Sequence, residues 1–100
     1  MALFDLLGRH WAMGILWHLC EAGPLTFRAL ETKCESITPA SLNKRVKELR
    51  AAGLVERTEG GYAATDLGKR LYPRLLSIAD FSLEWAGHLS QRDQEIRRVR

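Results

Sequence analysis

Apolar residues recur every three or four positions along most of the chain, which is the spacing of one face of an α-helix. Thr26 and Thr38 stand where N-cap residues are expected, and Pro39 fits a first turn, where its missing N–H costs nothing. With Gly and Pro as breaks, the pattern predicts three helical segments, over about 3–22 with a break near Gly8, over about 27–33, and over about 39–52.

The pattern changes after Gly53, where residues 54–58 alternate between apolar and polar as a strand does. The turn sequence 59–61 and a weak returning strand over 62–64 complete a small β-hairpin. Thr65 then caps a long helix over about 66–89, which Pro73 should bend or locally break. This order predicts a mainly α fold with a small β-hairpin, a winged helix-turn-helix with a long C-terminal dimerisation helix. Alternating βαβ units are absent, which excludes a parallel sheet.

Length and composition favour one globular domain, because the 100 residues are 46% hydrophobic and 27% charged. We expect residues 1–90 to form a DNA-binding domain with dimerisation helices at both ends, and residues 91–100 to be a basic, frayed tail. No apolar run approaches the roughly 18 residues of a membrane span, and the N-terminus does not resemble a signal peptide. Two cysteines make no disulfide framework. These features predict a cytoplasmic protein without a membrane partner.

The third predicted helix concentrates the basic charge of the chain. Residues 38–58 carry five basic side chains against two acidic ones, whereas the whole chain has a net charge of +3. At about 100° per residue, Leu42, Val46 and Leu49 share a core face, and Lys44 and Lys47 lie opposite. Small alanines beside these lysines would let the helix approach the floor of a major groove.

A short helix, a turn, a basic helix and a hairpin together predict binding to double-stranded DNA. Lysines reach phosphates or guanine edges, an Asn can hold adenine through two hydrogen bonds, and a helix N-terminus favours a phosphate. The predicted DNA-binding residues are Thr38, Ser41, Asn43, Lys44, Arg45, Lys47, Arg50 and Arg57. The alternative is a solvated basic face on a winged helix that binds proteins and no nucleic acid.

Four segments of the chain, spanning Leu3 to Leu89, resemble motifs of one family, the HxlR-type regulators of bacteria and archaea, which are MarR-related winged-helix proteins. GRHWAMGILWHL resembles their GGKWTLLIL segment, and GPLTFRAL resembles GPxRFxEL. SITPASLNKRVKELRAAGLVER resembles GISxxxLxxRLKELExxGLVxR, and TDLGKRLYPRLLSIADFSLEWAGHL resembles LTxxGxxLxPxLxxLxxWxxxH. The joint occurrence is specific, although GLVER alone occurs in many winged helices.

The resemblance implies that residues 38–50 form the helix that reads the major groove. Arg45 matches an Arg of the family motif and could brace the domain or touch phosphate, whereas Trp11 and Trp85 match tryptophans of the core or the dimer interface. Two features depart from the family. The turn 59–61 makes a short wing with a negative charge at its tip, and the reactive Cys that many members carry near the N-terminus has no counterpart before Cys20.

The last predicted helix is apolar around about half of its circumference, more than one small domain can cover. We interpret this arc and the apolar N-terminus as a two-fold homodimer interface, so that two recognition helices about 34 Å apart read a palindromic operator. Leu76 and Leu83 could instead cover the wing. The predicted interface residues are Leu3, Phe4, Leu7, Leu76, Leu83 and Trp85.

Other candidate chemistry is sparse. Cys34 is the candidate for a redox switch because it precedes the recognition helix, although its spacing favours burial in the core. The histidines form no metal-ligand spacing, and no catalytic motif is present, so we expect no metal, no cofactor and no enzyme activity. A small-molecule effector could bind between the first and last helices, near Trp11, Trp17 and Trp85.

Overall fold

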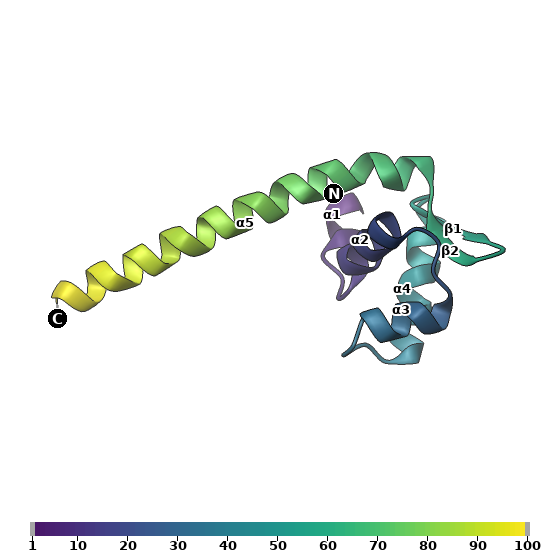
Figure 1. The fold of residues 1–100 in the computed structure, drawn as a ribbon, viewed down its shortest axis with the longest axis horizontal. Helices are drawn as coiled ribbons and strands as arrows, with labels where there is room; N and C mark the ends of the chain where they lie inside the picture. The colour runs from purple at the N-terminus through teal and green to yellow at the C-terminus, as the bar shows by residue number, and fades with distance from the viewer. Residues whose placement is uncertain (1, 100) are drawn as a thin grey trace.

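The computed structural model describes residues 2–99 and shows a winged helix-turn-helix with one long helix extending from it (Figure 1). The fold class predicted from the sequence is confirmed. The elements in chain order are α1 (Ala2–Leu7), α2 (Ala12–Ala22), α3 (Phe27–Lys33), α4 (Pro39–Ala51), β1 (Val55–Thr58), β2 (Gly61–Ala64) and α5 (Asp66–Val99). None of the helices formed by residues 2–99 is long and apolar enough to cross a membrane.

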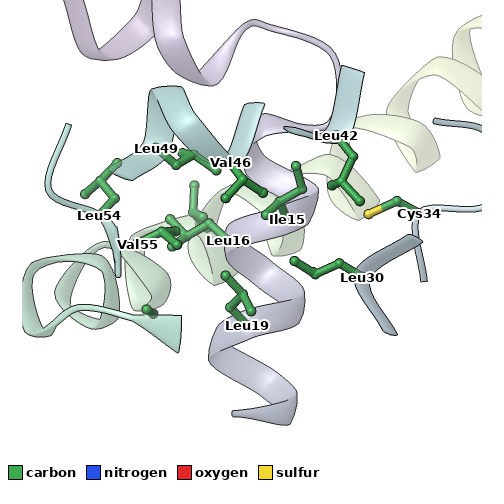
Figure 2. Packing of buried hydrophobic residues seen from close by; sticks show 12 residues of the cluster. Ile15, Leu16, Leu19, Leu30, Cys34, Leu42, Val46, Leu49, Leu54 and Val55 are labelled. Atoms are coloured by element: carbon green, nitrogen blue, oxygen red, sulfur yellow. The ribbon is translucent and has the colours of Figure 1, made fainter. Parts of the chain in front are cut away.

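A single apolar cluster holds these elements together, with α2 at its centre (Figure 2). Ile15 and Leu16 of α2 are fully buried, and they meet side chains from α3, α4 and the start of the hairpin. Burying each such side chain contributes about 1.5–3 kcal/mol. The core therefore fixes α4 relative to α2 and α3. The side chains from the other elements include Leu30, Leu42, Val46, Leu49, Leu54 and Val55.

The helix ends follow the predicted capping residues. The Thr26 hydroxyl accepts a hydrogen bond from the Ala29 N–H at 3.1 Å, and the Thr38 hydroxyl accepts one from the Ser41 N–H at 3.1 Å. Thr65 caps α5 in the same way, through the N–H of Gly68 at 3.1 Å. Each cap satisfies a donor that the first turn of a helix leaves without a backbone partner.

The hairpin pairs β1 with β2 in antiparallel register, from Val55 opposite Ala64 to Thr58 opposite Gly61. The extended link between α2 and α3 adds a bridge to its outer edge, where Leu25 and Tyr62 exchange backbone hydrogen bonds of 2.9 and 2.7 Å. The wing is therefore attached to the start of the helix-turn-helix as well as to the end of α4.

The break in the first helical segment falls at residues 8–11, close to the predicted Gly8. Trp11 begins α2 in the left-handed region, with φ of 70°, which is costly for a residue with a Cβ. Its indole Nε1 is buried and finds no hydrogen-bond partner among residues 2–99. The side chain of Trp11 thus supports the packing of the α1–α2 connection rather than a polar contact.

The last helix is continuous through Pro73, where a bend or a local break is expected, and it extends beyond its predicted end. Pro73 does not break α5, and the side chain of Arg74 donates a hydrogen bond of 2.7 Å to the Arg70 carbonyl close to the proline. Residues 91–99, predicted as a frayed tail, continue the helix, while Arg100 lies outside the described residues. This segment contains no Gly or Pro, and its acidic and basic residues are spaced three and four apart, as in Asp93 and Arg97, which stabilises a helix.

Candidate nucleic-acid interface

The second helix of the helix-turn-helix, α4, separates apolar from polar positions as the projection predicts. Leu42, Val46 and Leu49 are at most 1% exposed and face α2. The side chains on the remaining faces are exposed at Ala40, Asn43, Lys44, Lys47, Arg50 and Ala51. The exposed face therefore combines small residues with three cations and one amide, which suits a helix that enters a major groove.

The N-terminus of α4 offers a second feature that favours anions. Thr38 and Ser41 are joined by a hydrogen bond of 2.9 Å between their hydroxyls, with Thr38 as the donor. The unbonded N–H groups of the first turn and the helix dipole create a partial positive charge at this end. A phosphate next to Thr38 would meet this charge, and Lys44 is exposed six residues further along.

Arg45 braces the domain, one of the two roles that the sequence leaves open. Its Nε donates a hydrogen bond of 3.1 Å to the His10 carbonyl, and its Nη1 lies 3.0 Å from Glu48 Oε2. Glu48 also accepts a hydrogen bond of 2.7 Å from Arg9. These contacts tie α4 to the α1–α2 connection. Sequence reasoning missed Arg9, because nothing in the local pattern shows which distant carboxylate it meets.

Glu48 is held in its charged form by these two arginines. Desolvation alone would raise the pKa of Glu48, but hydrogen bonds from Arg9 and Arg45, and the charges of both guanidinium groups, outweigh it and lower that pKa. The carboxylate therefore offsets one of the two positive charges that contact it, and it engages Arg45 within the domain. Arg45 is thus a weaker candidate for a phosphate contact than the exposed lysines of α4.

The wing is as short as the sequence indicates. Glu59 and Gly60 form the turn between β1 and β2, so an exposed carboxylate stands at the tip. The Arg57 guanidinium lies over the Tyr62 ring, 5.9 Å from its centroid, and the side chain remains exposed. This arrangement places one cation beside the hairpin and none at its turn.

Both cysteines lie where a thiol is poorly reactive. Cys34 is fully buried, and burial raises the pKa of its thiol. Burial also raises the pKa of Cys20, although the charge of Lys69 opposes the shift, and its Sγ lies 4.0 Å from the Gly68 carbonyl. A redox switch needs an accessible thiol with a lowered pKa, so the environment of Cys34 does not favour that role.

Of the predicted interface residues, Leu7 is the one that the chain itself buries, with 9% exposure, because it closes α1 against the rest of the domain. The others are exposed, Trp85 by 54% and Leu83 by 76%, so Leu76 and Leu83 do not cover the wing. Phe81, which the sequence analysis missed, is 63% exposed on α5. The exposed members of the predicted set are Leu3, Phe4, Leu76, Leu83 and Trp85.

A hollow of about 290 Å³ lies between α2 and α5, close to the region in which the sequence analysis placed an effector. Trp17 lines it, together with Met13, Leu75 and Ile78. Trp11 and Trp85 do not belong to its lining, and Trp17 also packs edge-on against Tyr72. One of the three predicted tryptophans therefore borders this hollow.

A buried helix-turn-helix core, an exposed basic face on its second helix and an adjoining hairpin define a winged helix-turn-helix DNA-binding protein. The chain belongs to the HxlR-like helix-turn-helix family, whose model matches residues 6–90.

Relatives and solved structures agree with this assignment. The HTH-type transcriptional regulator BH0655 of Halalkalibacterium halodurans is 33% identical over 87 residues, covering 80% of this chain and 77% of that protein. The HTH-type transcriptional regulator YvaP of Bacillus subtilis is 31% identical over 88 residues, covering 81% of each. Quinone-bound YodB from B. subtilis superimposes with a TM-score of 0.78 at 28% identity, over 83% of this chain and 93% of that one. The family and these relatives are transcriptional regulators and not enzymes.

Proposed function

We propose that this chain is a homodimeric transcriptional regulator that recognises a palindromic operator in double-stranded DNA. Membership of the helix-turn-helix family supports DNA-binding regulation. The homodimer is supported by exposed apolar residues on α1 and α5, since monomers rarely expose an extended apolar face. Two copies of α4 related by a two-fold axis would read two half-sites about one DNA turn apart.

The observation that carries the proposal is that the basic side chains of α4 differ in their contacts. Arg45 is paired within the domain, whereas Lys44 and Lys47 are exposed on the face away from the core. In this arrangement the lysines are available for phosphates or guanine edges, and Asn43 beside them is available for a base edge. In the proposal, Arg50 at the C-terminal end of α4 and Arg57 in the wing add contacts to the DNA phosphates.

Replacing Lys47 by alanine should weaken binding to every duplex and reduce the salt dependence of log K by about one per protomer, because one phosphate contact is lost. Arg45→Ala is the matched control. It should lower the melting temperature and leave the salt slope unchanged, because Arg45 contacts Glu48 and the His10 carbonyl. Fluorescence anisotropy between 50 and 200 mM salt measures both slopes. An unchanged salt slope for Lys47→Ala would show that Lys47 makes no phosphate contact.

Asn43→Ala should relax the preference for one base pair in each half-site, because an Asn amide discriminates adenine by two hydrogen bonds. The expected discrimination is about 1–3 kcal/mol at that position. The measurement compares affinities for a selected duplex and its single-base variants. An equal loss of affinity on all duplexes, random sequences included, would contradict a role for Asn43 in reading sequence.

A further inference from the structure

An apolar hollow of about 470 Å³ lies between α1 and the N-terminal half of α5, and the DNA-binding face of α4 does not use it. Its volume falls within the range of about 300–1,000 Å³ that is typical of small-molecule sites. Leu3 of α1 and Leu67 of α5, which line it, are 42% and 51% exposed. The apolar walls of the hollow are therefore accessible from solvent. Leu6, Leu54 and Leu71 complete its leucine lining.

Two arginines, Arg70 and Arg74, lie one turn apart on α5 and also line the hollow. The Arg74 side chain is directed toward Arg70, since its Nη1 donates a hydrogen bond of 2.7 Å to the Arg70 carbonyl. Each guanidinium has five N–H donors, so most of these donors remain for another acceptor. No carboxylate from residues 2–99 lines the hollow, and neither arginine forms an ion pair with residues 2–98. The hollow thus combines apolar walls with two positive charges.

The chemistry of the lining selects among anions. Among the described residues, every neutral side chain that lines the hollow is a leucine or an alanine. Such walls favour contact with a hydrocarbon chain, and they offer no ring for stacking and no hydroxyl for a polar substituent. Guanidinium groups bind a carboxylate through paired hydrogen bonds. These features match a carboxylate with an aliphatic tail better than an aromatic or a sugar-containing anion.

The wall that α1 forms is attached to the domain. Leu7, the last residue of α1, is 9% exposed, and Arg9 forms the ion pair of 2.7 Å with Glu48 of α4. The hollow is therefore present without a ligand, and binding does not require α1 to rearrange. Ala52 and Leu54, between α4 and β1, also line it. An occupant would thus contact both α1 and the connection between α4 and the wing.

Most of the proposed homodimer interface lies away from the hollow. Leu76 and Leu83 are about 120–180° around α5 from the α5 residues that line it. Trp85 is on the same side of the helix as the hollow, but about 16 Å beyond Arg74 at 1.5 Å per residue. Leu3 belongs to both surfaces, so an occupant would reach the edge of the interface. A homodimer built on these residues is compatible with an occupied hollow.

We propose that this hollow binds an aliphatic carboxylate of medium chain length. The tail lies against the leucines of α1 and α5, and the carboxylate is bound by Arg70 and Arg74. Because Ala52 and Leu54 join α4 to the wing, an occupied hollow changes the affinity for operator DNA. This effector role rests on the proposed function, whereas the binding of the ligand does not.

Calorimetric titration of the DNA-free chain tests the binding site. Octanoate should bind saturably, and 1-octanol and octyltrimethylammonium should bind about tenfold or more weakly, because neither carries the anionic group. From hexanoate to decanoate the affinity should rise about fourfold for each added methylene, since each buried methylene contributes a constant increment. Salicylate, an aromatic carboxylate, should bind about tenfold or more weakly than decanoate. Absence of saturable binding of decanoate up to about 1 mM would overturn the site.

Arg70→Gln with Arg74→Gln should raise the Kd for octanoate about tenfold or more and change that for 1-octanol less than about threefold. Arg92→Gln with Arg97→Gln is the matched control, because it removes the same charge from an exposed part of α5 beyond the hollow. It should leave both affinities unchanged. Ala52→Leu narrows the hollow and should shift the preference from decanoate toward hexanoate. Equal losses of octanoate affinity in the two arginine variants would indicate general electrostatic attraction and would overturn the site.

Operator affinity and sedimentation, each measured with and without decanoate, separate this inference from the proposed function. A change in operator Kd of about fivefold or more, absent from Arg70→Gln with Arg74→Gln, supports the effector role. Decanoate binding with an unchanged operator Kd overturns the effector role and leaves the site standing. A homodimer that binds operator DNA and excludes decanoate, because a second copy fills the hollow, overturns the site and leaves the proposed function standing. Decanoate binding by a chain that binds no duplex overturns the proposed function and supports the site.

Discussion

Replacing Gly68 by alanine is expected to lower the free energy of unfolding by about 2–4 kcal/mol. Gly68 is buried in the first turn of α5, and an added Cβ would collide with the carbonyl oxygen of Leu54 and press on a methyl of Leu16, 3.2 Å away. The backbone cannot easily withdraw at this point. The Leu54 carbonyl accepts the Thr65 N–H at 3.0 Å, and Thr65 caps α5 and also hydrogen-bonds the Gly53 carbonyl at 2.5 Å.

Gly87→Ala provides the control within the same helix. Among residues 2–99, no atom outside the adjacent backbone of α5 lies within 4 Å of a Cβ added there, so alanine should stabilise α5 by about 0.5–1 kcal/mol through its better helix propensity. Urea denaturation followed by circular dichroism measures both variants. If Gly68→Ala unfolds at the same urea concentration as Gly87→Ala, the close approach of α5 to Leu54 is wrong.

The combined change Lys44→Glu and Lys47→Glu should reduce affinity for operator DNA about a hundredfold to a thousandfold at physiological salt. A homodimer would lose four phosphate-facing cations, and each lost contact weakens binding about fivefold at 0.15 M salt. The new carboxylates would also repel the phosphates. Both side chains are exposed on α4, so the fold and its melting temperature should remain nearly unchanged.

The control is the double change Arg97→Glu and Arg98→Glu. It alters the net charge of the chain by the same amount as the two lysine substitutions, but at the exposed end of α5. This control should retain most of the affinity, because it tests long-range attraction alone. Equal losses in the two double variants would show that α4 contributes no local contact. A gel-shift titration against one duplex is sufficient for the comparison.

The elements of the fold could be predicted because local signals mark their ends. Thr26, Thr38 and Thr65 are caps in the structure as in the sequence, and the hairpin falls where the apolar period changes from helix to strand. The end of α5 could not be placed in this way. Residues 91–99 have adequate helix propensity and no breaker, and their polar composition alone suggested fraying.

The candidate site was predictable where it depends on one helix and unpredictable where it depends on contacts between distant segments. The projection of α4 identifies Lys44 and Lys47 as exposed residues, because one helix settles which face is apolar. The pairing of Arg45 with the His10 carbonyl joins residues 35 positions apart, and no periodicity reveals it. The sequence likewise predicts Leu7 at an interface, whereas Leu7 is buried within its own chain, since an apolar residue on a short helix can face either the domain or a partner.

Selection of bound duplexes from a random pool tests the central claim most directly, because it reports binding, sequence preference and half-site spacing together. If two copies of α4 read adjacent major grooves, the enriched sequences should form an inverted repeat with half-site centres about one DNA turn apart. The variant with Lys44→Glu and Lys47→Glu should enrich nothing. Failure of the unmodified chain to enrich any duplex, or recovery of the same repeat by the variant, would contradict a DNA-reading role for α4.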